Sequence, residues 1–413
     1  MRALQEGNAT ARAVCTLRGL AGIEKSLLKG RLLLQEAADA GDPLAICLLG
    51  HEFKKRKQFD EAYNCYTHAV EIGGDAPHPF ALLTLGFATG EGIGCPRSRK
   101  RAFALYEQAA DLGYLPAVFA MGVAADEAKE PEKAVDSYRR GAELGDARSQ
   151  FNLSISYMRG DGVDKDPEQA RHWLEQAAEN GHTKAMFLLG STVAKDAPED
   201  DEAAATAAKW FKAAADKQYV PAMYNYAVCC ELGKGTAQSV DEATKYFAMA
   251  ASAGDVNAML ALGNAYALGN YGFEENHKRS VYWFAQGARV GDAKCMFNLG
   301  NSMASGRGVK RDYEAAAKWY VEAAKRGFEP ALGRLGVLYR EGLGVAKDVD
   351  RAADLFLQSK HDSFQAMFAA LPERTRSEAE WRRRDGSMWN PRETDAAGGE
   401  SKSWSGWFKG IFS

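Results

Sequence analysis

The sequence has little of what secreted, membrane-spanning or nucleic-acid-binding proteins need. No apolar run reaches the ~18 residues that cross a bilayer, and the N-terminus has no continuous apolar segment of a secretory signal peptide. The seven cysteines have no regular spacing, which favours free thiols in a reducing compartment. Lys and Arg (52) nearly balance Asp and Glu (55), so the basic excess of a dedicated nucleic-acid binder is absent.

Catalytic and metal-binding patterns are missing as well. None of the seven histidines stands at metal-ligand spacing from Cys, Asp or Glu, and no nucleophile is paired with a base. We therefore expect no enzymatic activity, no metal, no cofactor and no small-molecule substrate.

What the sequence does contain is a tandem repeat. Small residues recur at intervals of 32 to 37, most often 36, and Gly or another small residue follows five positions after nearly all of them. The first column is Ala45, Ala81, Ala117, Ser149, Ala185, Ala222, Ala258, Cys295, Ala331 and Ala366. The second is Gly50, Gly86, Gly122, Ser154, Gly190, Ala227, Gly263, Gly300 and Gly336. Glycine inside a helix costs about 1 kcal/mol, so we expect a neighbouring helix to pack closely there.

A second helix follows in each unit, marked by a large apolar residue. Eight positions before each marker stands a residue that is most often Ser, Asp or Asn, the types that accept a hydrogen bond from a starting helix. This predicted N-cap column is Ser26, Gln58, Ser98, Glu130, Asp166, Ala203, Ser239, Asn276, Asp312 and Asp348. Paired glycines, as in Gly306-Arg-Gly308, supply the turn between the helices, except in two units with shorter turns.

The combination of Gly-x-Gly-Val, a cap, Ala317-Lys-Trp-Tyr320 and Ala323-Ala-x-x-Gly327 resembles the Sel-one-like repeat (SLR) family, relatives of the tetratricopeptide repeat. The resemblance covers roughly residues 26–371. It implies an all-α, right-handed superhelical solenoid of about nine antiparallel helix pairs. It also implies a scaffold or adaptor that binds partner proteins through its concave face.

Around this solenoid we expect an N-terminal segment at 1–25 and a tail at 372–413. Arg2, Arg12 and Arg18 with only one acidic residue make residues 1–23 either a mitochondrial presequence or a helix that caps the array. The expected location is cytoplasmic, with mitochondrial as the alternative. Two other functions stay open: an organellar assembly factor, and an RNA-binding repeat protein, which the acidic balance disfavours.

Asparagines follow the small column and predict a protein-binding groove. Their amides could donate to and accept from an extended peptide, or could hold a neighbouring loop. They are Asn152, Asn225 and Asn298, with Asn264 and Asn301 one turn further along.

The tail carries a second candidate. Ser377 and Glu380 resemble a capping box before a short basic helix, and a Gly- and Ser-bearing linker follows. The last segment then concentrates large apolar residues: Trp404, Trp407, Phe408, Ile411 and Phe412. At helical spacing they could dock on a partner, touch a membrane surface peripherally, or fold back and cap the solenoid.

Overall fold

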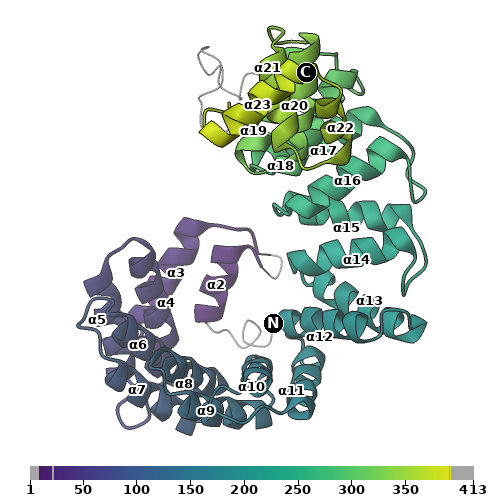
Figure 1. Ribbon diagram of the computed structural model, residues 1–413. Coiled ribbons are helices and arrows are strands. Elements are labelled where there is room, and N and C mark those ends of the chain that lie inside the picture. Colours follow the sequence, from purple (N-terminus) through teal and green to yellow (C-terminus); the bar gives the residue numbers. More distant parts are fainter. Residues whose placement is uncertain (1–8, 21–22, 390, 392–413) are drawn as a thin grey trace. The chain divides into compact units, whose positions relative to one another are not determined.

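The computed structural model describes residues 9–20, 23–389 and 391, within which every regular element is a helix (Figure 1). It separates into two compact units, residues 1–189 and 190–413, and each consists of helix pairs packed one against the next. The all-α class and the tandem helix pairs are confirmed.

The first unit contains five complete pairs. They are α2 (Ala9–Arg18) with α3 (Leu27–Asp39), α4 (Pro43–Lys55) with α5 (Phe59–Glu71), α6 (Pro79–Glu91) with α7 (Arg99–Asp111), α8 (Leu115–Glu127) with α9 (Pro131–Glu143), and α10 (Ala147–Arg159) with α11 (Pro167–Glu179). Helix α12 (Thr183–Asp196) contains the boundary between the units.

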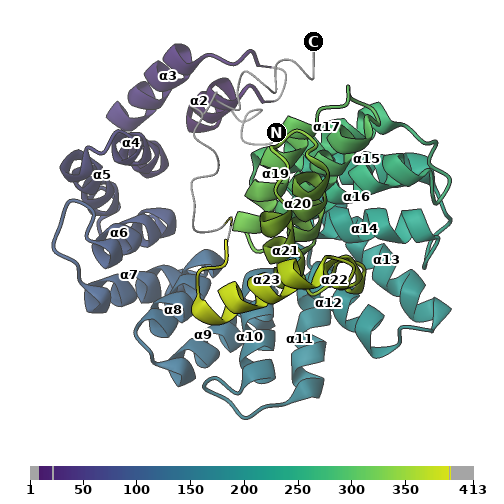
Figure 2. The ribbon, with the colours of Figure 1, turned by 45° about the horizontal axis from the view of Figure 1, so that its top comes forward.

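The second unit continues the pattern. Helix α13 (Asp201–Asp216) is followed by α14 (Val220–Leu232) with α15 (Val240–Ser252), α16 (Val256–Leu268) with α17 (His277–Arg289), α18 (Ala293–Ser305) with α19 (Tyr313–Lys325), and α20 (Pro330–Glu341) with α21 (Val349–Gln358). Two further helices, α22 (Asp362–Ala369) and α23 (Glu373–Asp385), complete it (Figure 2).

The predicted N-caps are present where the column holds Ser, Asp or Asn. Each of these seven side chains accepts a hydrogen bond from a backbone N–H of the first turn, as Asp312 does from Ala315 at 2.9 Å. The prediction is wrong at Ala203, which lies inside α13 because that helix starts three residues earlier. There Asp200 accepts from the Glu202 N–H at 2.9 Å.

The two small columns have different partners. At the glycine column, the ring of the second helix in the same pair lies directly on the backbone. A Cβ on Gly263 would be 2.3 Å from Cε1 of Phe284, and one on Gly300 would be 2.7 Å from Cε1 of Tyr320. The marker aromatic and the glycine are therefore one packing unit.

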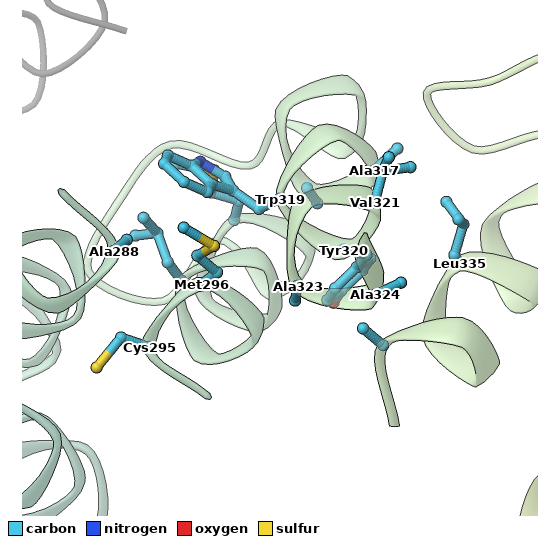
Figure 3. Packing of buried hydrophobic residues seen from close by; sticks show 14 of the residues in the cluster. Ala288, Cys295, Met296, Ala317, Trp319, Tyr320, Val321, Ala323, Ala324 and Leu335 are labelled. Atoms are coloured by element: carbon cyan, nitrogen blue, oxygen red, sulfur yellow. The ribbon is translucent and has the colours of Figure 1, made fainter. Parts of the chain in front are cut away.

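The small column itself is fully buried from Ala45 to Ala331. Its two non-alanine members each face a glycine on the preceding second helix. Ser149 faces Gly141, and Cys295, whose neighbours are shown in Figure 3, faces Gly287. The seven other second helices from α3 to α19 have alanine at the position of Gly141 and Gly287, so a larger side chain on one helix accompanies a smaller one on the other.

The paired glycines of the turn have separate tasks. Gly306 ends α18 with φ 75°, a conformation that side chains with a Cβ rarely adopt. Gly308 also has a positive φ, and a Cβ there would be 2.1 Å from the carbonyl oxygen of His277, in the preceding pair. The second glycine thus allows one turn to rest on the pair before it.

The two shorter turns solve the same problem without glycine. Lys57 (φ 61°) and Lys129 (φ 60°) take the left-handed conformation after α4 and α8. Lys57→Gly should therefore raise the free energy of unfolding by about 0.5–1 kcal/mol, because glycine adopts this conformation without a Cβ penalty. Urea denaturation measures the change, with Lys54→Gly inside α4 as a control of opposite sign. A loss of stability in Lys57→Gly would contradict the assignment.

The helical array begins before residue 26. Helix α2 packs on α3, buries Thr10, Ala13 and Thr16, and is tied to the next pair by a hydrogen bond from the Thr10 hydroxyl to Asp42. Residues 9–18 are thus the first helix of a pair.

The C-terminal end is covered by the first part of the tail. Helix α23 packs on α21, where Arg382 Nε donates to the buried Asp354 carboxylate at 2.9 Å (Figures 1 and 2). The Trp389 N–H donates to the same carboxylate at 3.1 Å, and the Trp389 ring lies edge-on to Tyr339. The expected capping box is wrong: α23 begins at Glu373, so Ser377 is inside the helix.

The half-buried His182 should make stability depend on pH. Burial lowers the pKa of His182, the charges of Lys184 and Arg148 lower it further, and Nδ1 accepts from the Ala185 N–H at 3.3 Å. Below a pH of about 6.5 His182 is protonated in the unfolded chain but stays largely neutral in the folded chain. The free energy of unfolding therefore decreases as the pH is lowered. In His182→Asn, melting curves between pH 8 and pH 5 should show a smaller acid loss than wild type. An unaltered loss, matching that of the control His172→Asn on the exposed side of α11, would contradict this assignment.

Candidate functional site

The predicted asparagines lie on the first helices of their pairs. Asn152 is on α10 in the first unit, whereas Asn225, Asn264, Asn298 and Asn301 are on α14, α16 and α18 in the second. All are half-buried except Asn264, which is exposed. The structure therefore groups four of the five within one unit and places Asn152 in the other.

Two of these amides join neighbouring pairs. Asn298 Nδ2 donates to Asn264 Oδ1 at 3.3 Å, which links α18 to α16. The second donor of Asn298 and the amino group of Asn264 can still bond a ligand, since each amide carries two donors and an acceptor.

Two other amides bond tyrosines. Asn301 Oδ1 accepts from the Tyr320 hydroxyl at 2.9 Å, in the second helix of the same pair. Asn152 also bonds a tyrosine hydroxyl, that of Tyr138. These bonds fix the side chains on the first-helix surface rather than in the loops between pairs.

An aromatic column runs beside the asparagines and was missed in the sequence. Phe151, Tyr224 and Phe297 each precede an asparagine and are half-buried. The Phe297 ring lies 5.1 Å from that of Phe328. The signal was available, because these residues keep the same repeat spacing as the asparagines. An amide beside a half-buried ring offers both hydrogen bonds and apolar contact to a peptide.

A polar cluster lies at the edge of the core of the second unit, where α13, α14 and α15 meet. The Lys212 ammonium lies 4.9 Å from the Tyr226 ring centre and donates to the Tyr246 hydroxyl at 3.1 Å. Tyr246 in turn donates to Asp216 at 2.6 Å, and Tyr226 donates to Glu242 at 2.9 Å. Burial raises the pKa of both tyrosines, so the hydroxyls stay protonated and hold the three helices together.

The buried thiols are not activated. Burial raises the pKa of Cys47 and of Cys229 to about 11, which keeps both protonated near neutral pH, whereas a nucleophile must be a thiolate. Burial also raises the pKa of Cys295, the one cysteine in the column of small residues. In the parts of the chain described, no three His, Cys, Asp or Glu side chains are grouped to hold a metal.

Trp404, Trp407, Phe408, Ile411 and Phe412 lie outside the described residues, and residues 1–8 do so too. Among the helices that are described, none is long and apolar enough to span a membrane.

Comparison with known families gives a match over more than half of the chain. The family model for the Sel1 repeat matches eight segments: 9–42, 79–114, 147–182, 183–219, 220–255, 256–292, 293–328 and 330–360. The two long gaps between them, 43–78 and 115–146, contain the pairs α4–α5 and α8–α9. These are the pairs with the two shorter turns, in which lysine rather than glycine takes the left-handed conformation.

Curated relatives match over parts of the chain. An F-box protein of Arabidopsis thaliana is 48% identical over 60 residues, covering 14% of this chain and 16% of that protein. An exopolysaccharide production negative regulator of Rhizobium meliloti is 26% identical, covering 37% and 62%. Cytochrome c oxidase assembly factor 7A of Xenopus laevis is 30% identical, covering 29% and 59%. The chain thus matches less than two thirds of the length of these relatives.

Solved structures with the same fold match over most of the chain. A protective antigen of uropathogenic Escherichia coli, described as having an SLR fold, has a TM-score of 0.61 and 25% identity, covering 97% of this chain and 90% of that one. A Sel1 repeat protein from Oxalobacter formigenes has a TM-score of 0.53 and 24% identity, covering 75% and 90%.

Proposed function

The chain belongs to the Sel1 repeat family, whose members generally mediate protein–protein interaction, and we propose that it is a scaffold that binds an extended segment of a partner protein. The binding surface is the row of asparagines and half-buried rings on α14, α16 and α18. The observation that supports this most directly is the Asn264–Asn298 bond, which brings amides of neighbouring repeats into contact on the first-helix surface.

Repeat arrays suit this task because neighbouring units present the same position at a regular interval. An extended peptide has backbone donors and acceptors along its whole length, and an asparagine can satisfy both kinds. The rings of Tyr224 and Phe297 supply the apolar part of the contact.

We propose no catalytic role. Sel1 repeat scaffolds are typically non-enzymatic, and the buried thiols stay protonated. We likewise propose no cofactor and no nucleic-acid partner, since the net charge of −3 offers little attraction to phosphates.

The test is affinity purification of the intact chain beside Asn264→Ala/Asn298→Ala, read by quantitative mass spectrometry. Lys294→Ala, an exposed position on α18, is the matched control. We expect proteins that co-purify with wild type and with the control to be lost from the double variant, whose melting temperature should stay close to wild type. An unchanged set of partners would remove the asparagine row from the binding surface.

The apolar motif near residues 404–412 is proposed as a second docking element. Its test is a chain that ends at Pro391, which keeps α23 and Trp389 on the array. Loss of partners or of membrane fractionation would support docking on a protein or on a membrane surface, respectively. Unchanged profiles with lower thermal stability would instead indicate that the motif covers the array.

A second candidate function is that of an assembly factor, favoured by the similarity to the Xenopus protein. The two candidate functions imply different locations for the protein. We propose the cytoplasm, with mitochondria as the alternative. Removal of residues 1–23 as a presequence would delete α2, half of the first pair, which supports an intact N-terminus. N-terminal sequencing of the protein isolated from each cell fraction decides between the two.

A further inference from the structure

A basic edge lies on the first unit and consists of residues 54–57 and 97–101. The first run is Lys-Lys-Arg-Lys around the end of α4, and the second is Arg-Ser-Arg-Lys-Arg around the start of α7. All eight basic residues except Lys54 are exposed. Over residues 52–61 and 91–101, eight basic residues stand beside four acidic ones, in a chain whose net charge is −3. The turn between α10 and α11 instead carries three aspartates and one lysine.

Packing between neighbouring pairs brings the two runs together. The Lys54 ammonium lies 4.3 Å from the centre of the Phe87 ring, which joins α4 to α6. In the turn before α7, Gly94 lies directly on the Phe59 carbonyl, and a Cβ there would overlap it. Both contacts are within the first unit, where α4 to α7 are neighbours (Figure 2). The cations of both runs are therefore on one edge.

Most of these cations are not used by the array. Within the described part of the chain, ion pairs join only two of the eight to carboxylates. Lys55 bonds Glu52 at 2.7 Å, and Arg97 lies 4.0 Å from Glu127. The other six are left to interact with something outside the array.

The helix dipole accounts for the first run but not for the second. Cations at the end of α4 stabilise that helix, because its C-terminus is partly negative. Arg99, Lys100 and Arg101 instead fill the first turn of α7, where positive charge destabilises a helix and where no acidic residue stands. The first turns of α9, α11, α13, α15 and α19 all contain acidic residues. The second run is thus kept at the expense of its own helix, which points to a role outside the fold.

Two aromatic rings are exposed beside the cations. Phe59 is 45% exposed and Phe87 is 48% exposed. The neutral polar side chains at this edge are already bonded, since Gln58 donates to Glu61 at 3.2 Å and Ser98 caps α7. The edge therefore offers charge and apolar surface without the free amides that would bind a peptide backbone. This combination suits the lipid–water interface, where basic side chains meet anionic headgroups and rings enter the acyl boundary.

We propose that the basic edge docks the first unit on an anionic lipid surface. The cations attract the headgroups from a distance, and Phe59 and Phe87 add apolar contact once the edge reaches the interface. The contact is peripheral and reversible. Its residues belong to the first unit, so the proposal is independent of the asparagine row on α14, α16 and α18.

The test is sedimentation of the intact chain with vesicles of phosphatidylcholine that contain about one third phosphatidylserine. We expect binding that weakens as salt is added, and little binding to pure phosphatidylcholine. Arg99→Glu/Lys100→Glu should weaken binding roughly 30-fold or more, because it removes two cations and adds two repelled carboxylates. Lys278→Glu/Lys294→Glu, at two exposed positions of the second unit, changes the net charge equally and should bind like wild type.

Stability separates docking from a structural role. Arg99→Glu/Lys100→Glu should melt at or above the temperature of wild type, because acidic residues stabilise a helix start. Phe59→Ala/Phe87→Ala should weaken vesicle binding roughly tenfold and keep its salt dependence, because the cations remain.

Other occupants of the edge give different results. A chain that binds poly-glutamate or single-stranded RNA but not the anionic vesicles would overturn the proposal in favour of an acidic protein or an RNA. Equal vesicle binding by Arg99→Glu/Lys100→Glu and by its control would also overturn it. The lipid contact would then belong to another part of the chain, such as the motif near residues 404–412, which both variants retain.

Discussion

Gly263→Leu is expected to lower the free energy of unfolding by about 3 kcal/mol, at the upper end of what overpacking costs in a core. A Cβ alone would be 2.3 Å from Cε1, 2.5 Å from Cδ1 and 3.0 Å from Cζ of Phe284, so the larger leucine side chain must displace this ring. Phe284 is itself buried and belongs to α17, so the clash must separate α16 from α17. Because each pair is stabilised by its interfaces with the neighbouring pairs, separating α16 from α17 should also destabilise the adjoining pairs of the second unit.

The measurement is thermal unfolding followed by circular dichroism, where we expect the melting temperature to fall by roughly 5–10 °C. Ala227→Gly is the matched control at the same column. It should cost about 1–2 kcal/mol through helix propensity and the loss of one buried methyl group, because it creates no clash. A melting temperature of Gly263→Leu equal to that of wild type would show that this column is not a close contact.

Gly287→Ala is the second substitution with a large expected effect, and its sign depends on one neighbour. The new Cβ would be 2.3 Å from Sγ of Cys295, so we expect a loss of about 1–3 kcal/mol. In a Cys295→Ala background the sulfur is gone. The Cβ of residue 295 would still be 2.8 Å from the new Cβ, so the two helices must move slightly apart. The same substitution should then lie between no change and a gain of about 1 kcal/mol, since alanine is the better helix former.

A double-mutant cycle measured by urea denaturation gives the coupling energy, which should be at least about 1 kcal/mol and favourable in the double variant. Ala250 and Ala258, which occupy the two positions in the preceding repeat, show that an alanine–alanine contact fits the array. Additive effects of Gly287→Ala and Cys295→Ala would mean that the two residues are not in contact.

The repeat spacing predicted the fold well because it is set by local rules. Ser98 and Asp312 are predictable as caps because their side chains can accept hydrogen bonds from the free amides of a helix start. The glycine column is predictable because only a residue without a side chain lets a ring contact the helix backbone directly. Both rules act within a single helix pair. The prediction failed at Ala203, where a run of alanines and acids extends α13 by a turn and Asp200 serves as the cap.

The candidate site was less accessible from the sequence. Spacing located the asparagines but could not reveal that Asn301 bonds Tyr320 while Asn298 bonds Asn264, since side-chain direction depends on tertiary packing. The contact between Cys295 and Gly287 joins neighbouring pairs, so it could not be predicted from either residue alone. In the sequence, each of the two is only a small residue within its own helix. The burial of Asp354 was hidden for a similar reason, because its partners Arg382 and Trp389 lie beyond the last repeat.

The covering of α21 by α23 also bears on how many molecules can join end to end. A stack of similar units has no inherent length, and an open last unit could receive the first unit of another molecule, as in head-to-tail filaments. Arg382 and Trp389 take up the hydrogen-bonding capacity of Asp354 on this face, so growth past residue 391 would require α23 to leave. Asp354→Ala should therefore release α23 from α21. Molecules of this variant should then join end to end in increasing number as the concentration rises.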